Sequence, residues 1–243
     1  MDLNGHETGV LFAGIVFRGL TQKELAVPVH GLKLIFPVNA ELILMAEKNP
    51  EFRGVLSRHT STFDGFWPYL LASLKFRTKV QKISGSEFVH SLFERAAREH
   101  MRIFFLGATP KVNQAAREAV QRQYGIELAG YSPDFESYPY SEKTNATILQ
   151  EVRRAQPQVL LVAFGAPKQE LWLDTHIQEL EKMGIRLAMG VGGTLDMLAG
   201  VYKKAPRFIS FLGLEGIWRV LLDPKRIKRF PNPFRFFRVA LHS

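Results

Sequence analysis

Residues 159–200 constrain the fold of this chain more than any other stretch. Residues 159–164 form an almost unbroken apolar run, which is typical of a parallel strand buried on both faces. Gly165 follows, and residues 168–182 have the apolar spacing of an amphipathic helix. A second apolar run, residues 185–191, then ends at a pair of glycines. This order predicts part of an open α/β sheet. Its glycine turns either bind a ligand at the carboxyl edge of the strands or only allow tight strand-to-helix turns.

The rest of the chain continues the alternation of strands and helices. Asn39 and Thr109 are expected N-caps, Pro110 suits a first helical position, and Gly125 ends a helix. The pattern predicts a parallel sheet with right-handed crossovers. The further expected strands are residues 9–17, 32–38, 102–106 and 127–131, and the further expected helices are residues 21–26, 40–48, 67–74, 87–100, 110–124 and 141–155.

Charge divides the chain into two expected domains. The formal net charge of the chain is +9. The residues from 203 onward hold ten Lys or Arg against only Glu215 and Asp223, so this segment alone carries a net charge of +8. We therefore predict a folded body at residues 1–202 and a basic appendage at residues 203–243. No cysteine is present, which excludes disulfides and cysteine-bound metals. The apolar runs are too short to span a bilayer, and we expect no secretory signal.

The appendage mixes bulky apolar residues with Lys and Arg. Near its end, Phe234, Phe236 and Phe237 alternate with Arg235 and Arg238. This composition is typical of an amphipathic helical element that lies on an anionic membrane surface. The alternative is that the apolar face packs on the body while the charges are solvated. The composition favours membrane contact.

Few residues suggest catalysis on their own. The sequence contains no Asp-x-Asp, no His-Glu-x-x-His and no Gly-x-Ser-x-Gly, which argues against metal catalysis and a serine hydrolase. Asp64, between Phe63 and Gly65, is either a general base in a partly apolar turn or only a turn residue. Asp196 either bonds a ribose or sugar hydroxyl or sits in a first helical turn.

Seven motifs together resemble one protein family. The sequence resembles the WecG/TagA/CpsF glycosyltransferases, bacterial inverting enzymes that move a sugar from a UDP-sugar to a polyprenyl-diphosphate-linked sugar. The resemblance implies a Rossmann-like α/β body without a metal or other cofactor, and an appendage that completes the site at the membrane. The motifs are PVNAE (37–41), FDG (63–65), FFLGATP (104–110), GAPKQELW (165–172), GVGGTLDMLAG (190–200), KAP (204–206) and GLEGIWRVLLDPKRIKR (213–229).

The resemblance also implies roles for particular residues. Asp64 matches the general base, and Lys82 stands where relatives carry Arg at the acceptor or diphosphate site. Pro37 stands where relatives carry Thr, so this chain lacks a hydroxyl and a backbone donor there. The residues that match the nucleotide-sugar site are Asn39, Gly107, Gly165, Gln169, Gly190, Gly192, Gly193 and Asp196. The appendage residues that match diphosphate-binding arginines are Arg219, Arg226 and Arg229.

The expected protein is a hexosyltransferase on the cytoplasmic face of a bacterial membrane, where it takes part in surface polysaccharide synthesis. Its expected partners are a UDP-sugar, a lipid-diphosphate-linked saccharide and an anionic membrane, with a homo-oligomer allowed and no nucleic acid. An NAD(P) oxidoreductase ranks lower, because the first strand lacks the fingerprint glycines and the acidic residue at the expected spacing. A nucleic-acid binder that uses the Phe-rich basic tail also ranks lower.

Overall fold

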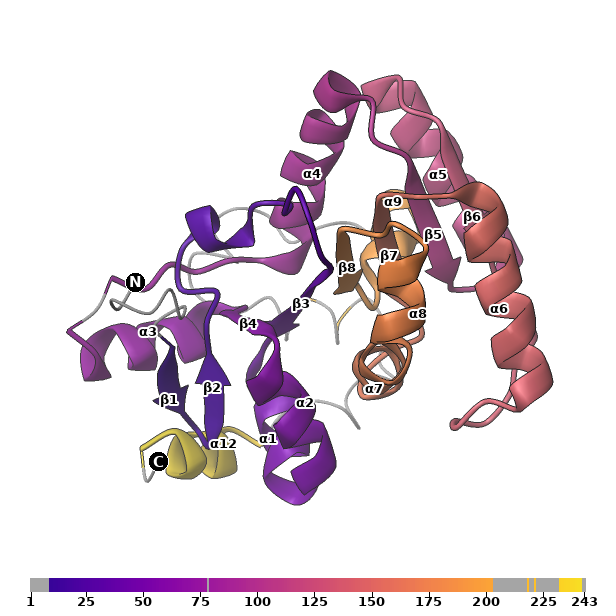
Figure 1. Cartoon of the computed structure of the whole chain (residues 1–243). Helices are drawn as coiled ribbons and strands as arrows, with labels where there is room; N and C mark the ends of the chain where they lie inside the picture. The colour runs from indigo at the N-terminus through magenta and orange to yellow at the C-terminus, as the bar shows by residue number, and fades with distance from the viewer. Residues whose placement is uncertain (1–8, 78, 203–217, 219–220, 222–231, 242–243) are drawn as a thin grey trace. The chain divides into compact units, whose positions relative to one another are not determined.

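The computed structural model describes residues 9–77, 79–202, 218, 221 and 232–241. Six strands form one sheet with the order β4-β3-β8-β7-β5-β6, and helices flank it, which confirms the predicted α/β class (Figure 1). The strands are β3 (Lys33–Val38), β4 (Thr60–Phe63), β5 (Ile103–Gly107), β6 (Leu128–Tyr131), β7 (Val159–Ala163) and β8 (Leu187–Gly190).

The chain divides into two compact units. Unit 1 combines residues Met1–Ala26, Ile35–Ser84 and Lys204–Ser243, and unit 2 combines Val27–Leu34 with Gly85–Lys203. The predicted domain boundary follows residue 202. The next residues, 203–217, lie outside the described part of the chain.

The sheet of unit 2 is made of strands buried on both faces. β5 pairs in parallel with β6 and β7, and β7 pairs in parallel with β8. Every residue of β5 and β8 is buried, as expected for strands covered on both sides. Because parallel strands end at the same edge, Gly107 lies opposite Ala163 and Val162 lies opposite Gly190. The sheet therefore brings the turns after β5, β7 and β8 together.

The helices of unit 2 begin and end largely as predicted. Thr109 accepts a hydrogen bond from the Val112 amide at 3.3 Å, and Gly125 ends α5 in a left-handed conformation. The single helix expected over residues 168–182 is wrong, since His176 separates two helices there. α5 packs against α9, β6, β5 and α4, and α6 packs against β6 (Figure 1). The helices are α4 (Gly85–Glu99), α5 (Pro110–Tyr124), α6 (Glu142–Ala155), α7 (Lys168–Thr175), α8 (Ile177–Lys182) and α9 (Thr194–Leu198).

Unit 1 opens with a hairpin where one strand was expected. β1 (Val10–Phe12) pairs antiparallel with β2 (Ile15–Phe17), apart from the six-stranded sheet. The two turn residues, Ala13 and Gly14, both have positive φ, as the favoured two-residue hairpin turn requires. The prediction of one strand over residues 9–17 is therefore wrong. The helix expected next is a short 3-10 turn, η1 (Gln22–Leu25).

An aromatic core fixes the end of β4 in unit 1. The Phe63 ring stacks on Phe17 with ring centroids 4.0 Å apart, and Phe12 meets Phe63 edge-on at 5.6 Å. All three side chains are fully buried. Aromatic pairs of this kind contribute beyond the area that they bury. The core therefore holds Phe63, the residue directly before Asp64, in one position.

The helices of unit 1 are α1 (Ala40–Lys48), α2 (Pro50–Arg58), α3 (Phe66–Lys75) and α12 (Pro233–Leu241). α12 packs on α1, where it buries Phe236 and Ala240 and forms an ion pair from Arg235 to Glu47 at 2.7 Å. Among the helices that the structure describes, none combines the length and the apolar character needed to cross a membrane.

Candidate functional site

One candidate group of site residues lies at the carboxyl edge of β5, β7 and β8 in unit 2. The Gly107 carbonyl accepts hydrogen bonds from Asn113 Nδ2 and Ser132 Oγ, each at 3.0 Å. The Ala108 amide donates to Ala163 O at 3.2 Å, and the Val191 amide donates to Val162 O at 2.8 Å. These bonds connect the three strand ends at one edge. The edge carries Gly107, Gly165, Gly190, Gly192 and Gly193, all predicted as nucleotide-sugar-binding residues.

Gln169 joins two of these turns. Its side chain is buried, and its Oε1 accepts hydrogen bonds from the Gly165 amide at 3.1 Å and from the Gly192 amide at 3.2 Å. Its Nε2 donates to Glu170 Oε1 at 2.8 Å. The two glycine N–H groups, which are candidate anion-binding donors in the sequence, therefore already have a partner inside the protein.

Glu170 is the unexpected member of this group. Its side chain is only 1% exposed, and among the described residues its Oε2 has no hydrogen-bond partner. Burial raises the pKa of the Glu170 carboxyl from 4.5 to about 7, although the bond from Gln169 acts in the opposite direction. Sequence reasoning did not single out Glu170, because a glutamate in the first turn of an amphipathic helix is normally solvated.

Gly190 gives the Gln169 amide room. A Cβ atom at position 190 would lie 2.6 Å from Gln169 Nε2 and 3.0 Å from its Cδ. Real Cβ contacts are essentially never below 3.0 Å. Packing against Gln169 therefore explains why position 190 has no side chain, whether or not a ligand binds there.

Asp196 lies beyond the second glycine turn. It sits in the first turn of α9 and is half-buried, as one of its two sequence interpretations expected. The Val201 amide donates to the Asp196 carbonyl at 2.9 Å. A carboxylate in a first helical turn is stabilised by the helix dipole.

An aromatic group supports the β7–α7 turn. Trp172 Nε1 donates to Asn145 Oδ1 at 2.9 Å, and the Trp172 ring meets Phe164 edge-on at 5.7 Å. Tyr140 packs against Phe164 at 5.1 Å, and burial raises the pKa of its hydroxyl to about 12. Tyr140 therefore remains protonated over the physiological range. These contacts fix the start of α7, and with it Gln169 and Glu170.

A second candidate group of site residues lies in unit 1, at the ends of β3 and β4. Val38 and Phe63 are register partners, so Asn39 and Asp64 follow paired positions. The Asp64 amide donates to Val38 O at 3.1 Å, and its side chain is half-buried. Asn39 is the predicted N-cap of α1, since its Oδ1 accepts from the Leu42 amide at 3.1 Å. The structure therefore brings Asn39 and Asp64 to one edge.

Lys82 belongs to the same edge of unit 1. The neighbouring Ile83 amide donates to Phe63 O at 2.9 Å, which places the segment containing Lys82 beside the end of β4. Lys82 is half-buried. The three predicted diphosphate-binding arginines, Arg219, Arg226 and Arg229, lie outside the described residues.

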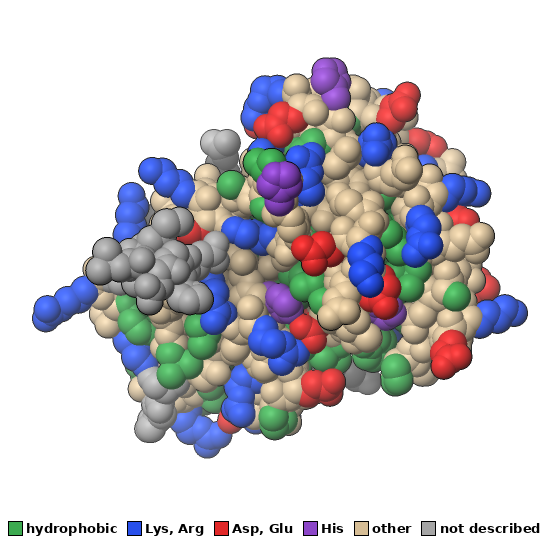
Figure 2. All heavy atoms as spheres, viewed as in Figure 1, with side chains coloured by type: hydrophobic (Ala, Val, Ile, Leu, Met, Phe, Trp, Pro, Cys, Tyr) green, Lys and Arg blue, Asp and Glu red, His purple; other side chains and the backbone are tan. Residues whose placement is uncertain are grey.

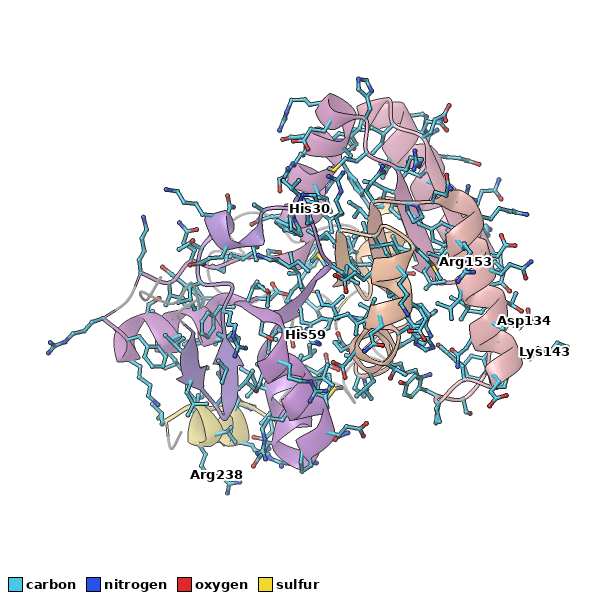
Figure 3. All side chains as sticks on the ribbon, in the orientation of Figure 1. His30, His59, Asp134, Lys143, Arg153 and Arg238 are labelled. Carbon is cyan, nitrogen blue, oxygen red and sulfur yellow. The ribbon has the colours of Figure 1, made fainter. Side chains whose placement is uncertain are left out.

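α12 presents an exposed face of mixed character. Phe234 is 86% exposed and Leu241 is 66% exposed. The Arg238 side chain, labelled in Figure 3, is also largely exposed, and its guanidinium lies 3.9 Å from Glu47. These three residues are spaced by four and three positions, so they share one face of the helix. The Phe237 ring also meets Trp67 of α3 edge-on at 5.4 Å. Figure 2 shows Lys, Arg and apolar side chains next to one another over this part of unit 1.

Acidic and histidine side chains do not gather into a metal site within the described ranges. No group of three or more His, Asp or Glu residues there is arranged to hold an ion. The structure therefore offers no metal centre in those ranges on which to build the site.

A substitution at Gly107 tests how closely the end of β5 approaches the backbone of Ala163 at the end of β7. Gly107 has a φ of +98°, and an added Cβ would lie 2.9 Å from the backbone of Ala163. We expect Gly107→Ala to lower the free energy of unfolding by about 2 kcal/mol, because backbone strain and a backbone clash add together. The control is Gly125→Ala, since Gly125 also has positive φ but nothing within 4 Å of an added Cβ. Equal losses in urea unfolding of the two variants would contradict the close approach at Gly107.

A comparison with known families identifies the chain. Residues 11–243 match the glycosyl transferase WecG/TagA/CpsF family. The match covers nearly the whole chain, so the chain belongs to this family. Membership makes sugar transfer its activity, with a sugar donor and an acceptor as its partners.

Proposed function

We propose that this chain moves a hexose, or a hexose derivative, from a UDP-sugar to a polyprenyl-diphosphate-linked saccharide. The reaction inverts the configuration at the anomeric carbon and needs no metal. The family match over residues 11–243 is the observation that carries this proposal. The product serves the synthesis of a bacterial cell-surface polysaccharide.

Asp64 acts as the general base in this reaction. The acceptor hydroxyl oxygen attacks the anomeric carbon, its proton passes to the Asp64 carboxylate, and the bond from that carbon to UDP breaks. UDP leaves with the bonding electrons, and attack from the face opposite to it inverts the configuration. Two features support this role: Asp64 is half-buried, and its backbone is held by Val38 O. A fixed base near a reacting hydroxyl is what general base catalysis requires.

Cationic side chains stabilise the departing diphosphate. In the absence of an Asp-x-Asp motif, the charge that develops on UDP needs fixed positive groups. Lys82 is a candidate because its segment lies beside the end of β4. Arg219, Arg226 and Arg229 are the others, and guanidinium groups suit a diphosphate because they bond in a bidentate manner. Lys82 carries charge without that forked geometry.

The glycine turns of unit 2 receive the nucleotide-sugar. With no Cβ at Gly107, Gly165, Gly192 and Gly193, a ligand approaches the backbone closely. Asp196 is proposed to accept a hydrogen bond from a ribose or sugar hydroxyl. The tie formed by Gln169 sets the spacing of the turns after β7 and β8.

A transfer assay tests this proposal. The full chain is incubated with radiolabelled UDP-sugars, a short-chain lipid-diphosphate saccharide and EDTA, and the labelled lipid product is counted. We expect transfer from one UDP-sugar at a rate that EDTA does not change. Parallel arms measure binding of NAD(P)H and of oligonucleotides, which the two lower-ranked functions require. Absence of a labelled product with every donor, or a strict need for a divalent ion, would contradict the proposal.

The exposed face of α12 is proposed to lie on an anionic membrane at its cytoplasmic side. We expect the full chain to float with vesicles that contain anionic phospholipid, and Phe234→Ser to lower the bound fraction severalfold by removing an inserted ring. The control is Phe135→Ser, because Phe135 is 96% exposed but belongs to unit 2. Equal flotation of both variants would argue against a role for α12.

A further inference from the structure

We infer that Glu170 is a positioning residue: it holds the Gln169 amide in the orientation that ties the β7–α7 turn to the β8–α9 turn. The donor-binding edge of unit 2 is thereby set before the nucleotide-sugar arrives. This role rests on the proposed function for its consequence in catalysis, but the tie itself is a property of the fold.

The tie depends on which atom of the Gln169 amide faces the glycines. Its oxygen accepts from two N–H groups, those of Gly165 and Gly192, which are 27 residues apart in sequence. If the amide turned over, its NH2 group would face both glycine N–H groups. These two contacts would then place donors against donors. A single orientation therefore satisfies the site.

Glu170 supplies the acceptor that the nitrogen end of this amide needs. The Gln169 Nε2 to Glu170 Oε1 distance is 2.8 Å, and both side chains are buried. A buried amide hydrogen without an acceptor costs more than the bond contributes, since no water replaces it. Gly190 lies against the same amide, since an added Cβ there would come within 2.6 Å of Gln169 Nε2. Glu170 and the glycine amides therefore hold Gln169 from opposite ends.

Burying a carboxyl for this purpose is costly, which argues that the position has a use beyond filling space. Glu170 is 1% exposed, and among the described residues its Oε2 has no partner. An apolar side chain at this place in α7 would avoid that cost. A function in orienting Gln169 explains why an acceptor stands here.

Two variants separate this role from simple packing. Glu170→Gln retains an acceptor oxygen for Gln169 Nε2, whereas Glu170→Met retains the bulk but removes the acceptor. Labelling with nitrogen-15 glycine gives at most 19 amide signals from the full chain, and the exchange of the Gly165 and Gly192 amides with solvent is measured directly. Gln169→Leu, which removes the tie itself, identifies the pattern that a lost tie produces.

In the Met variant, we expect exchange at Gly165 and Gly192 to accelerate about tenfold, as when one buried hydrogen bond is lost. The Gln variant should stay close to wild type. The KM for the donor should rise by a similar factor in the Met variant with kcat little changed, because the edge binds the donor and does not transfer the proton. Urea unfolding of each variant shows whether the whole fold has weakened.

Each outcome bears on the inference. Unchanged exchange at the two glycines in the Met variant would overturn it, as would equal acceleration at all glycines, which indicates general loosening. Faster exchange confined to Gly165 and Gly192 would support the tie, even if the wild-type chain transferred no sugar. In that last case the proposed function would fail while the positioning by Glu170 stood.

Discussion

We expect Asp64→Asn to lower kcat for sugar transfer by about two to four orders of magnitude, the usual contribution of a positioned general base. This corresponds to about 3–5 kcal/mol in the activation free energy. Asparagine has nearly the same shape as aspartate, but its amide does not take the proton of the acceptor hydroxyl. The backbone bond from residue 64 to Val38 O, at 3.1 Å, does not involve the side chain and should remain.

The matched measurement separates chemistry from binding. The affinity for UDP should change by less than about threefold in Asp64→Asn, since a base acts on the acceptor. Glu51→Gln provides the control, because Glu51 is an exposed carboxylate of the same unit, on α2. If Asp64→Asn transferred sugar as fast as the control, another group would have to take the proton.

The parts of the fold that could be predicted are those determined by local sequence. β7 follows from an apolar run, because a strand covered on both faces needs no polar residues. The caps at Asn39 and Thr109 follow from side chains that bond the backbone three residues on. Such signals act over a few residues, so no tertiary information is needed to interpret them.

The prediction lacks β4, α2 and the first hairpin. β4 was missed because Thr60, Ser61 and Thr62 are polar, yet all three are buried. The preceding helix α2 has a start that the sequence shows, since Asn49 caps it and Pro50 follows, although it is not among the predicted helices. The hairpin turn at Ala13 and Gly14 lacks the Asn-Gly or Asp-Gly pair that usually marks a two-residue turn.

The candidate site shows the same limit of local reasoning. The pairing of Val38 with Phe63 was needed to bring Asn39 and Asp64 to one edge, and no local pattern contains it. Gln169 is predicted to line the nucleotide-sugar site, and its contacts in the fold with Gly165, Gly192 and Glu170 are contained in no local pattern. The burial of Glu170 arises from tertiary packing around the first turn of α7.

The buried carboxyl of Glu170 should also make the stability of the protein depend on pH. Its pKa is raised by burial to about 7 in the folded chain, against 4.5 for an exposed carboxyl. Between these values the folded chain retains a proton that the unfolded chain has released. The unfolded state thus binds fewer protons, so the free energy of unfolding falls as pH rises from about 4.5 to about 7. The loss is complete above about pH 7 and amounts to about 3 kcal/mol.

Glu170→Gln should remove this dependence, because glutamine does not titrate. We subtract the free energy of unfolding of wild type from that of Glu170→Gln at each pH. This difference should increase by about 3 kcal/mol from pH 4.5 to pH 8. Urea unfolding at several pH values measures this difference, and all other titrating groups cancel because both proteins carry them. Glu99→Gln serves as the control, because an exposed carboxylate paired with Arg95 has a lowered pKa and acts in the opposite direction. Parallel curves for wild type and Glu170→Gln would mean that the pKa of Glu170 is the same in the folded and the unfolded chain, and would contradict this prediction.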